Sequence, residues 1–279
     1  MNWEVKPLDE AAALERFAAL LLPAVGEAMF KAALDPVAAD GTTSLAERAA
    51  QRIDQRERAR QARIEQIIGL AATEFAPVQA EVPADSAWLS RFFARAQDAE
   101  SEAEQEIWAR LLARELAEPG ACSKRALDFL GAMDAWELAG FAEYSAFAFT
   151  FESGWRFMFD EDSARREMWA YGRESDFSQH FIAIGLLAAE AGTIKPRSAR
   201  GLRLCYQGRT YELRDAPSGL PGSSTSELSY RKFTPIGQQL AGAIRAKSRF
   251  GYARNLLKTL GAERGLEFAL IEEPDGGQA

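Results

Sequence analysis

The stretch from Trp88 to Leu130 reads WLSRFFARAQDAESEAEQEIWARLLARELAEPGACSKRALDFL and contains the densest apolar and aromatic patterning of the chain. Ser101 and Glu104 have the spacing of a capping box, in which each side chain accepts a hydrogen bond from the backbone of the other residue. The helix that begins there stops at the Pro-Gly pair 119–120, and Ser123 can cap a further helix. The stretch therefore predicts three consecutive helices with defined ends.

A fourth helix is predicted to follow, because Asp134 and Glu137 repeat the capping-box spacing. Apolar side chains recur on one side of each helix, namely Trp88, Leu89, Phe92, Phe93, Ala96, Ile107, Trp108, Leu111, Leu112, Leu116, Leu127, Leu130, Trp136, Phe141 and Tyr144. An aromatic stripe at this spacing is typical of a buried core. Four short, capped helices with short connections predict a compact antiparallel bundle.

This central stretch resembles an uncharacterised bacterial family known as domain of unknown function 2806. The resemblance is carried by Trp88-Leu89-x-x-Phe92-Phe93, Ala96-Gln97-Asp98, Glu104, Trp108-Ala109-x-Leu111-Leu112-Ala113-x-Glu115, Pro119-Gly120 and Ser123-x-x-x-Leu127, and more weakly by Ile64-Glu65-x-Ile67-Ile68. The family has no established activity, so the resemblance implies kinship and no function.

An amphipathic helix is predicted in an N-terminal region spanning residues 1–40. Its apolar positions recur at helical spacing, at Leu14, Phe17, Leu21, Val25 and Met29. Packing in a core or between subunits is the expectation; binding to a membrane surface is the alternative, although the polar face lacks the usual basic residues. No secretory signal or membrane span is visible, and the expected location is cytoplasmic.

A long helix is predicted from about Leu45 to Phe75, and its two halves differ in polarity. The first half interleaves acids with the arginines Arg48, Arg52, Arg56, Arg58, Arg60 and Arg63 at spacings where opposite charges meet on a helix surface. A solvated, ion-paired face is the expectation there, with nucleic-acid contact as the alternative. The second half carries Ile64, Ile67 and Ile68, so only this end must be buried.

The chain changes character after residue 152. Alternating residues on either side of Gln207-Gly208 predict a β-hairpin, and residues 228–233 and 266–270 predict further strands. Helices are predicted from Phe177 to about Ala191, from Thr234-Pro235 onward, and from about Tyr252 to Leu260. The predicted fold is therefore mainly α, with a helical bundle over residues 41–152 followed by a smaller α+β domain over 153–279.

The C-terminal region resembles winged-helix domains in the order of its elements. A helix and a basic hairpin precede Phe233-Thr234-Pro235-Ile236-Gly237-x-x-Leu240, which is similar to the wing and following helix of those domains. The resemblance implies a winged-helix-like domain. The helix near His180, just before the hairpin, is largely apolar, so reading of a DNA sequence is not implied.

The net charge of −8 conceals a strong asymmetry. Residues 195–264 contain fourteen Lys or Arg against four acids, a charge near +10, so the remainder of the chain is near −18. A basic segment of this kind indicates an acidic partner, either nucleic acid bound through its phosphates or the acidic surface of a neighbouring subunit. The candidate contact residues are Arg203, Arg209, Arg214, Arg231, Lys232, Arg245, Lys247 and Arg249.

Few residues suggest catalysis. The chain lacks a Gly-rich phosphate loop and a nucleophile elbow. Cys122 and Cys205 follow no metal or redox spacing and His180 is the one histidine, so we expect free thiols, no metal site and no cofactor. Glu115 is the carboxylate most open to a catalytic role, although ion pairing or capping of a loop would also explain it. The acidic run 160–163 is expected to form a turn or a helix start.

Two functions follow from these patterns. The leading prediction is a non-enzymatic interaction and assembly protein, homo-oligomeric, whose basic C-terminal domain binds an acidic partner such as nucleic acid. The alternative is an effector or hydrolase with a carboxylate-based site in a bacterial stress or antiviral defence system.

Overall fold

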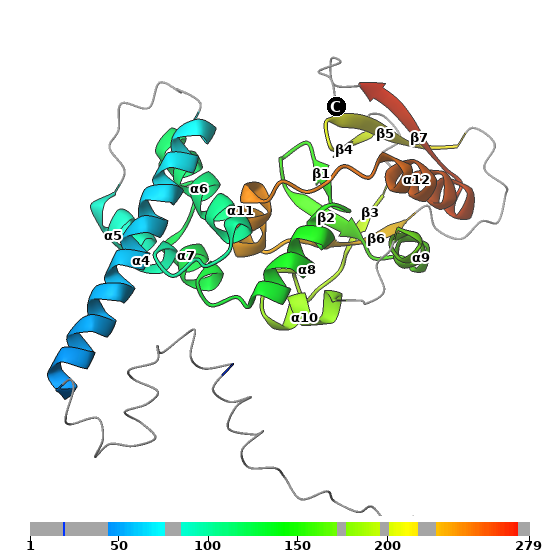
Figure 1. Cartoon of the computed structure of the whole chain (residues 1–279). Coiled ribbons are helices and arrows are strands. Elements are labelled where there is room, and N and C mark those ends of the chain that lie inside the picture. The colour runs from blue at the N-terminus through cyan, green and yellow to red at the C-terminus, as the bar shows by residue number, and fades with distance from the viewer. Residues whose placement is uncertain are drawn as a thin grey trace, which may run out of the picture. The chain divides into compact units, whose positions relative to one another are not determined.

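A computed structural model of the chain describes residue 19 and residues 44–75, 85–171, 177–195, 201–216 and 227–272 (Figure 1). Apart from residue 19, the predicted N-terminal amphipathic helix lies outside the described residues. The chain divides into two compact units, Met1–Glu65 and Gln66–Ala279. Within the described ranges, none of the helices is both long and apolar enough to cross a lipid bilayer.

Helix α4 (Leu45–Glu74) confirms the predicted long helix, and its residues 45–65 belong to the N-terminal unit. Its surface carries ion pairs, among them Arg58 with Asp54 at 3.0 Å and Arg60 with Glu57 at 3.3 Å. These pairs span four and three residues, where side chains on a helix meet. The expected ion-paired face is therefore present.

The four central helices are present as predicted and belong to the second unit. They are α5 (Ser86–Ala96), α6 (Glu102–Ala117), α7 (Lys124–Leu130) and α8 (Ala135–Ser145). The capping box is formed, because Ser101 N donates to Glu104 Oε2 at 3.1 Å and Glu104 N donates to Ser101 Oγ at 3.2 Å. Trp88 is buried and its indole donates to the carbonyl of Cys122 at 2.7 Å.

Most of the apolar stripe is core, but Leu116 and Trp136 are exposed. The rings of Trp88 and Phe92 stack at 5.2 Å between centroids, and Trp108 meets Phe92 edge-on at 5.4 Å. Trp136, which the stripe also included, is 51% exposed. It lies at the start of α8, where its ring packs 4.8 Å from the ring of His180 instead of entering the core.

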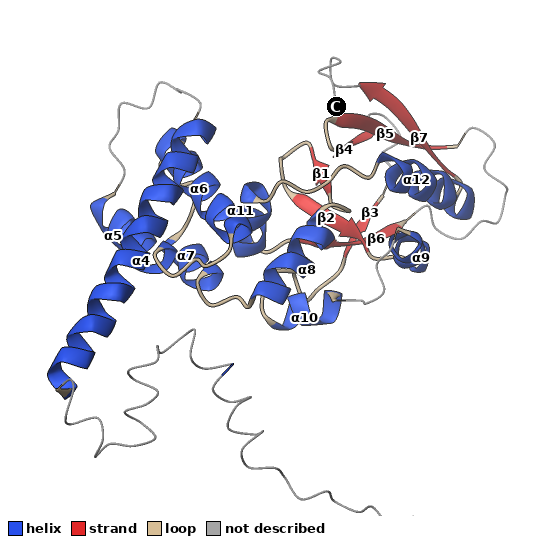
Figure 2. Cartoon of the chain, viewed as in Figure 1, coloured by secondary structure: helices blue, strands red, loops and turns tan. Residues whose placement is uncertain are grey.

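Within the described residues, seven strands form one antiparallel sheet in the order β3-β6-β2-β1-β4-β5-β7 (Figure 2). Their bounds are β1 (Phe149–Phe151), β2 (Arg156–Phe159), β3 (Gly192–Ile194), β4 (Leu202–Tyr206), β5 (Arg209–Asp215), β6 (Leu228–Lys232) and β7 (Leu266–Glu272). The predicted hairpin is confirmed as β4–β5, with Gln207 and Gly208 at positive φ of 48° and 84° as its two-residue turn requires.

The fold is therefore mixed α+β, a helical region followed by an antiparallel sheet, rather than mainly α. The sheet is larger than predicted because β1 and β3 are three residues long, too short for an alternating pattern to be read, whereas the strand-like alternation that ends at Phe159 is confirmed as β2. The winged-helix resemblance is not shown. The hairpin β4–β5 lies inside a seven-stranded sheet, whereas the sheet of a winged-helix domain has two or three strands.

The remaining described helices are α9 (Asp162–Ala170), α10 (Ser178–Ala183), α11 (Pro235–Ala243) and α12 (Phe250–Arg264). The predicted helix through Ala191 ends earlier, because Gly185 adopts a φ of 84° and Leu187 then bridges to Phe233. Helix α12 covers the aromatic face of the sheet, where Tyr252 is fully buried near Tyr206.

Helix α11 joins the helical region to the sheet (Figure 1). The predicted cap is confirmed, since Gly237 N donates to Thr234 Oγ1 at 3.1 Å. Thr234 Oγ1 also donates to the carbonyl of Gly185 at 2.6 Å, and a Cβ on Gly237 would collide with the carbonyl of Leu186. The helix packs against α6, α7 and α8, and the buried side chains on both sides of residue 152 form one continuous cluster. The domain boundaries at 40 and 152 stay predictions.

Candidate anion-binding site

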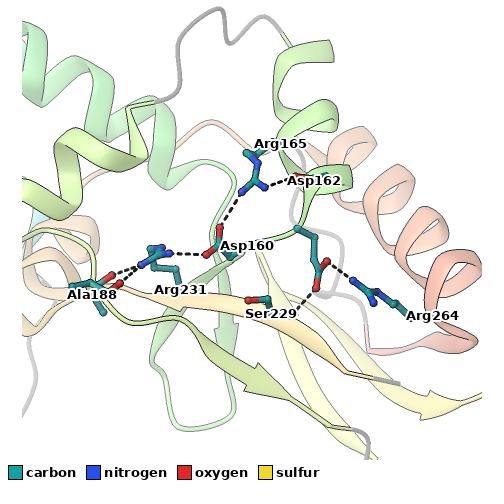
Figure 3. Close-up of polar contacts among 9 residues, drawn as sticks. Asp160, Asp162, Arg165, Ala188, Ser229, Arg231 and Arg264 are labelled. Atoms are coloured by element: carbon teal, nitrogen blue, oxygen red, sulfur yellow. Dashed lines mark hydrogen bonds and ion pairs between the residues drawn. The ribbon is translucent and has the colours of Figure 1, made fainter. Parts of the chain in front are cut away.

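Arg231 is a structural residue among the eight predicted contact residues. Its guanidinium donates to the carbonyls of Ala188 and Ala189 at 2.8 and 2.6 Å and to the carboxylate of Asp160 at 2.7 Å (Figure 3). The side chain is only 15% exposed. Three acceptors therefore hold this charge inside the fold.

The acidic run beside Arg231 is likewise occupied by arginines. Asp160 also accepts from Arg165 at 3.1 Å, while Glu161 accepts from Arg264 and from the backbone N–H of Ser229, both at 2.7 Å (Figure 3). Helix α9 begins at Asp162, so the run forms a helix start, one of the two structures expected for it. In the part of the chain that the structure describes, His, Cys, Asp and Glu side chains form no group of three that could hold a metal ion.

Three other predicted residues form ion pairs on the surface. Arg203 lies 3.6 Å from Glu152, Arg214 pairs with Glu212, and Arg245 lies 2.7 Å from Glu74. All three arginines are more than half exposed. Such exposed pairs contribute about 0–1 kcal/mol, so their arginines can exchange a carboxylate for another anion at little cost.

Four of the predicted residues gather around the connection between α11 and α12. Arg209 lies over the ring of Phe250 at 4.2 Å from its centroid, and Arg249 donates to the carbonyl of Tyr171 at 2.8 Å. Arg245 and Lys247 lie in the connection itself and are exposed. Lys232 stands apart from this group and is exposed near Tyr230, 5.9 Å from its ring centroid.

A polar cavity of about 510 Å³ lies against this connection. Its lining residues are Ser145, Ala148, Thr150, Arg156, Cys205, Gln207, Gly208, Ala241, Ile244, Arg245 and Ala246. Its floor is a row of cross-strand neighbours, because Arg156 pairs with Thr150 and Thr150 pairs with Cys205. Side chains alternate along a strand, so this row occupies the face of the sheet opposite the aromatic face that α12 covers.

Arg156 is the residue that distinguishes this cavity. It is half-buried, and among the described residues no carboxylate lies within ion-pair distance of its guanidinium. Burial lowers the pKa of Arg156, and the positive charge of Arg114 lowers it further. Arg114 is also half-buried, packs against Gly242 of α11, and has no ion-pair partner in the described ranges.

Two like charges at a partly desolvated site are costly, since buried charges in proteins are ordinarily paired. Ser145 also lines the cavity, but its hydroxyl is itself buried and has no hydrogen-bond partner among the described residues. An anion in the cavity would satisfy the guanidinium of Arg156. Sequence reasoning found Arg245 but missed Arg156 and Arg114; the available signal for Arg156 was one charge between the aromatic residues Trp155 and Phe157.

Glu115 and His180 already have partners. Glu115 is 3% exposed, and its two carboxylate oxygens accept from Gly120 N at 2.8 Å and Cys122 N at 2.9 Å. It therefore caps the loop after α6, one of the two structural roles expected. His180 Nε2 lies 2.7 Å from Glu137 Oε1. Burial, assisted by the charge of Glu115, raises the pKa of Cys122 to about 12.

The fold and site together define a mixed α+β protein with a basic, polar cavity on one face of an antiparallel sheet. The family model described as a protein of unknown function (DUF2806) matches residues 47–257. Because this span is most of the 279 residues, the chain belongs to that family. The match also includes the strands and helix α11 that form the cavity. Neither the curated proteins nor the solved structures contain a match to the chain.

Proposed function

We propose that this protein is a non-enzymatic interaction protein that binds an acidic partner, nucleic acid, at the cavity and the adjoining connection 244–249. The observation that carries the proposal is that Arg156 and Arg245 line one cavity, where Arg156 has no carboxylate partner in the described ranges and the charge of Arg114, outside the lining, adds to the positive field. Arginines of this kind bind phosphate oxygens through a planar fork of N–H donors.

The exposed part of the site suits a phosphate backbone. Lys247 is exposed in the connection, and Arg245 holds Glu74 only in a surface pair. A nucleic acid could replace that carboxylate and add phosphate contacts without rearranging the fold. The contacts would be to phosphates, so binding would be independent of base sequence and sensitive to salt.

Glu115 gives no support to the alternative of a carboxylate-based effector or hydrolase, because both of its oxygens accept backbone hydrogen bonds. Homo-oligomeric assembly and a winged-helix mode of binding stay parts of the wider prediction. The assembly can be checked directly by sedimentation velocity, and a monomer at high micromolar concentration would remove it.

The test is the anisotropy of a fluorescent 20-base-pair duplex titrated with the full chain at 50 and 200 mM NaCl. With about three phosphate contacts, the affinity should fall by roughly 40-fold between the two salt concentrations. The double variant Arg245→Gln with Lys247→Gln should weaken binding at least tenfold at 50 mM NaCl.

A matched control removes the same charge elsewhere. Arg56→Gln with Arg58→Gln changes two arginines that are exposed and ion-paired on α4. We expect this control to bind the duplex within twofold of the unaltered protein. Absence of binding at 50 mM NaCl, or an equal loss in both double variants, would overturn the proposal.

A further inference from the structure

The cavity beside the connection has the size of a small-molecule site. Its volume of about 510 Å³ falls within the range of roughly 300–1,000 Å³ that is usual for ligand pockets, and it exceeds what a single phosphate ion needs. The sheet forms its floor, the end of α8 and the turn 207–208 form walls, and the end of α11 with its connection forms another. The cavity therefore has room for a phosphate and an attached organic group.

The charges in and around this cavity favour a dianion. Arg156 and Arg245 supply two positive charges from the lining, of which Arg156 lacks a carboxylate partner among the described residues, and Arg114 adds a third charge from outside the lining. A carboxylate would neutralise only one of them, whereas a phosphomonoester carries about two negative charges at neutral pH and three acceptor oxygens. The match in charge is therefore better for a phosphomonoester.

A hydroxyl group lies beside Arg156 in the polar lining. Thr150, which carries it, is the neighbour of Arg156 across the β1–β2 pair. Hydroxyl and guanidinium donors together are the usual protein contacts to phosphate oxygens. Ala148, Ala241 and Ile244 provide apolar surface for the organic part.

We propose that this cavity binds a small phosphomonoester, with Arg156 holding the phosphate group. The inference deepens the proposed function, because it rests on the same site attracting a phosphate and assigns the enclosed part of that site to a small molecule. The small molecule would occupy the cavity floor, and a nucleic acid would contact the exposed connection.

Cys205 offers a direct readout, because it lies in the cavity floor and is partly exposed. Cys122 will not interfere, since it is buried and its pKa is raised to about 12. The experiment measures the rate at which a maleimide modifies Cys205 in the full chain, identified by peptide mass. The probes are inorganic phosphate, adenosine 5′-monophosphate and uncharged adenosine, all at matched ionic strength.

Phosphate and the monophosphate should slow modification of Cys205 at least fivefold in a saturable manner, and adenosine should not. Arg156→Gln should raise the probe concentration for half-protection at least tenfold. Arg156→Lys keeps the charge but loses the planar fork of donors, so its half-protection concentration should lie between those of Arg156→Gln and the unaltered protein. Arg203→Gln is the matched control, because Arg203 lies on the same face of the sheet but outside the cavity lining. In this variant the probes should protect Cys205 as well as they do in the unaltered protein.

Isothermal titration calorimetry with the monophosphate supplies a second measurement if Cys205 reacts too slowly in every sample. The proposal is overturned if the unaltered protein shows neither protection nor heat up to 10 mM probe, or if Arg156→Gln and Arg203→Gln behave alike. Protection without duplex binding would retain this inference and remove nucleic acid from the proposed function. Duplex binding without protection or heat would retain nucleic acid in the proposed function and remove the phosphomonoester.

Discussion

Arg231 and Arg156 lie on the same face of the sheet, but the fold treats their charges in opposite ways. Arg231 pairs with Met158 across β6 and β2, and Met158 is two residues from Arg156, so alternation places both arginines on one face. Arg231 donates to two carbonyls and one carboxylate, whereas Arg156 has no carboxylate within reach in the described ranges. The charge of Arg231 therefore stabilises the fold, whereas the charge of Arg156 is available to bind a ligand.

The largest effect on the free energy of unfolding is expected when Arg231 is replaced. Arg231→Gln leaves two carbonyls and part of Asp160 without their donor in a region that is mostly buried. Breaking a buried pair by removing one partner costs about 3–5 kcal/mol, so the free energy of unfolding should fall by roughly 3 kcal/mol. Urea denaturation measures it. Arg203→Gln, an exposed arginine on the same face, is the control and should change it by less than about 0.5 kcal/mol.

The opposite, aromatic face of the sheet should make the free energy of unfolding depend on pH in the alkaline range. Tyr206 is fully buried, donates to the carbonyl of Ala146 at 2.7 Å, and has its pKa raised to about 12, mainly by burial. A raised folded-state pKa gives stability that is complete below the unfolded value near 10 and is lost as pH rises toward 12. The loss from Tyr206 should reach roughly 2–3 kcal/mol.

Absorbance at 295 nm with far-UV circular dichroism checks this prediction. The pKa of Tyr252 is also raised by burial, so both phenols should ionise together with unfolding. Tyr206→Phe should remove part of the pH dependence. Ionisation of all the tyrosines near pH 10 in a folded protein would contradict the packing of this face.

The buried carboxylate of Glu115 is the anionic counterpart of Arg231. Glu115→Ala removes the acceptor of the N–H groups of Gly120 and Cys122, and only the first of these residues is exposed. An unsatisfied buried donor costs about 1–3 kcal/mol, so the free energy of unfolding should fall by roughly 2 kcal/mol. Thermal unfolding provides the measurement, with the exposed Glu118→Ala of the same loop as control. A change below 0.5 kcal/mol would mean that this carboxylate is not needed by the loop.

The same contrast explains what could be predicted from the sequence. Caps and helical periodicity depend on residues close together in the sequence, so the spacing of Ser101 and Glu104 was enough to predict the start of α6. Strand pairing is not local: Thr150 of the three-residue strand β1 pairs with Cys205, far along the chain. Arg231 and Asp160 are 71 residues apart. Counting charges located the basic third of the chain, but it could not tell which arginines the fold would satisfy.

The smallest effect on stability is expected at Arg156, and it tests the comparison most closely. Removing its charge takes no donor from any carboxylate in the described ranges and relieves repulsion from Arg114. Arg156→Gln should therefore change the free energy of unfolding by less than about 0.5 kcal/mol, or raise it slightly, at low salt. Urea denaturation at 20 and 500 mM NaCl checks this, because salt should stabilise the unaltered protein more than the variant. A loss of 2 kcal/mol or more would place Arg156 with Arg231 among the arginines that the fold needs, and would contradict a ligand-binding role for Arg156 at the cavity.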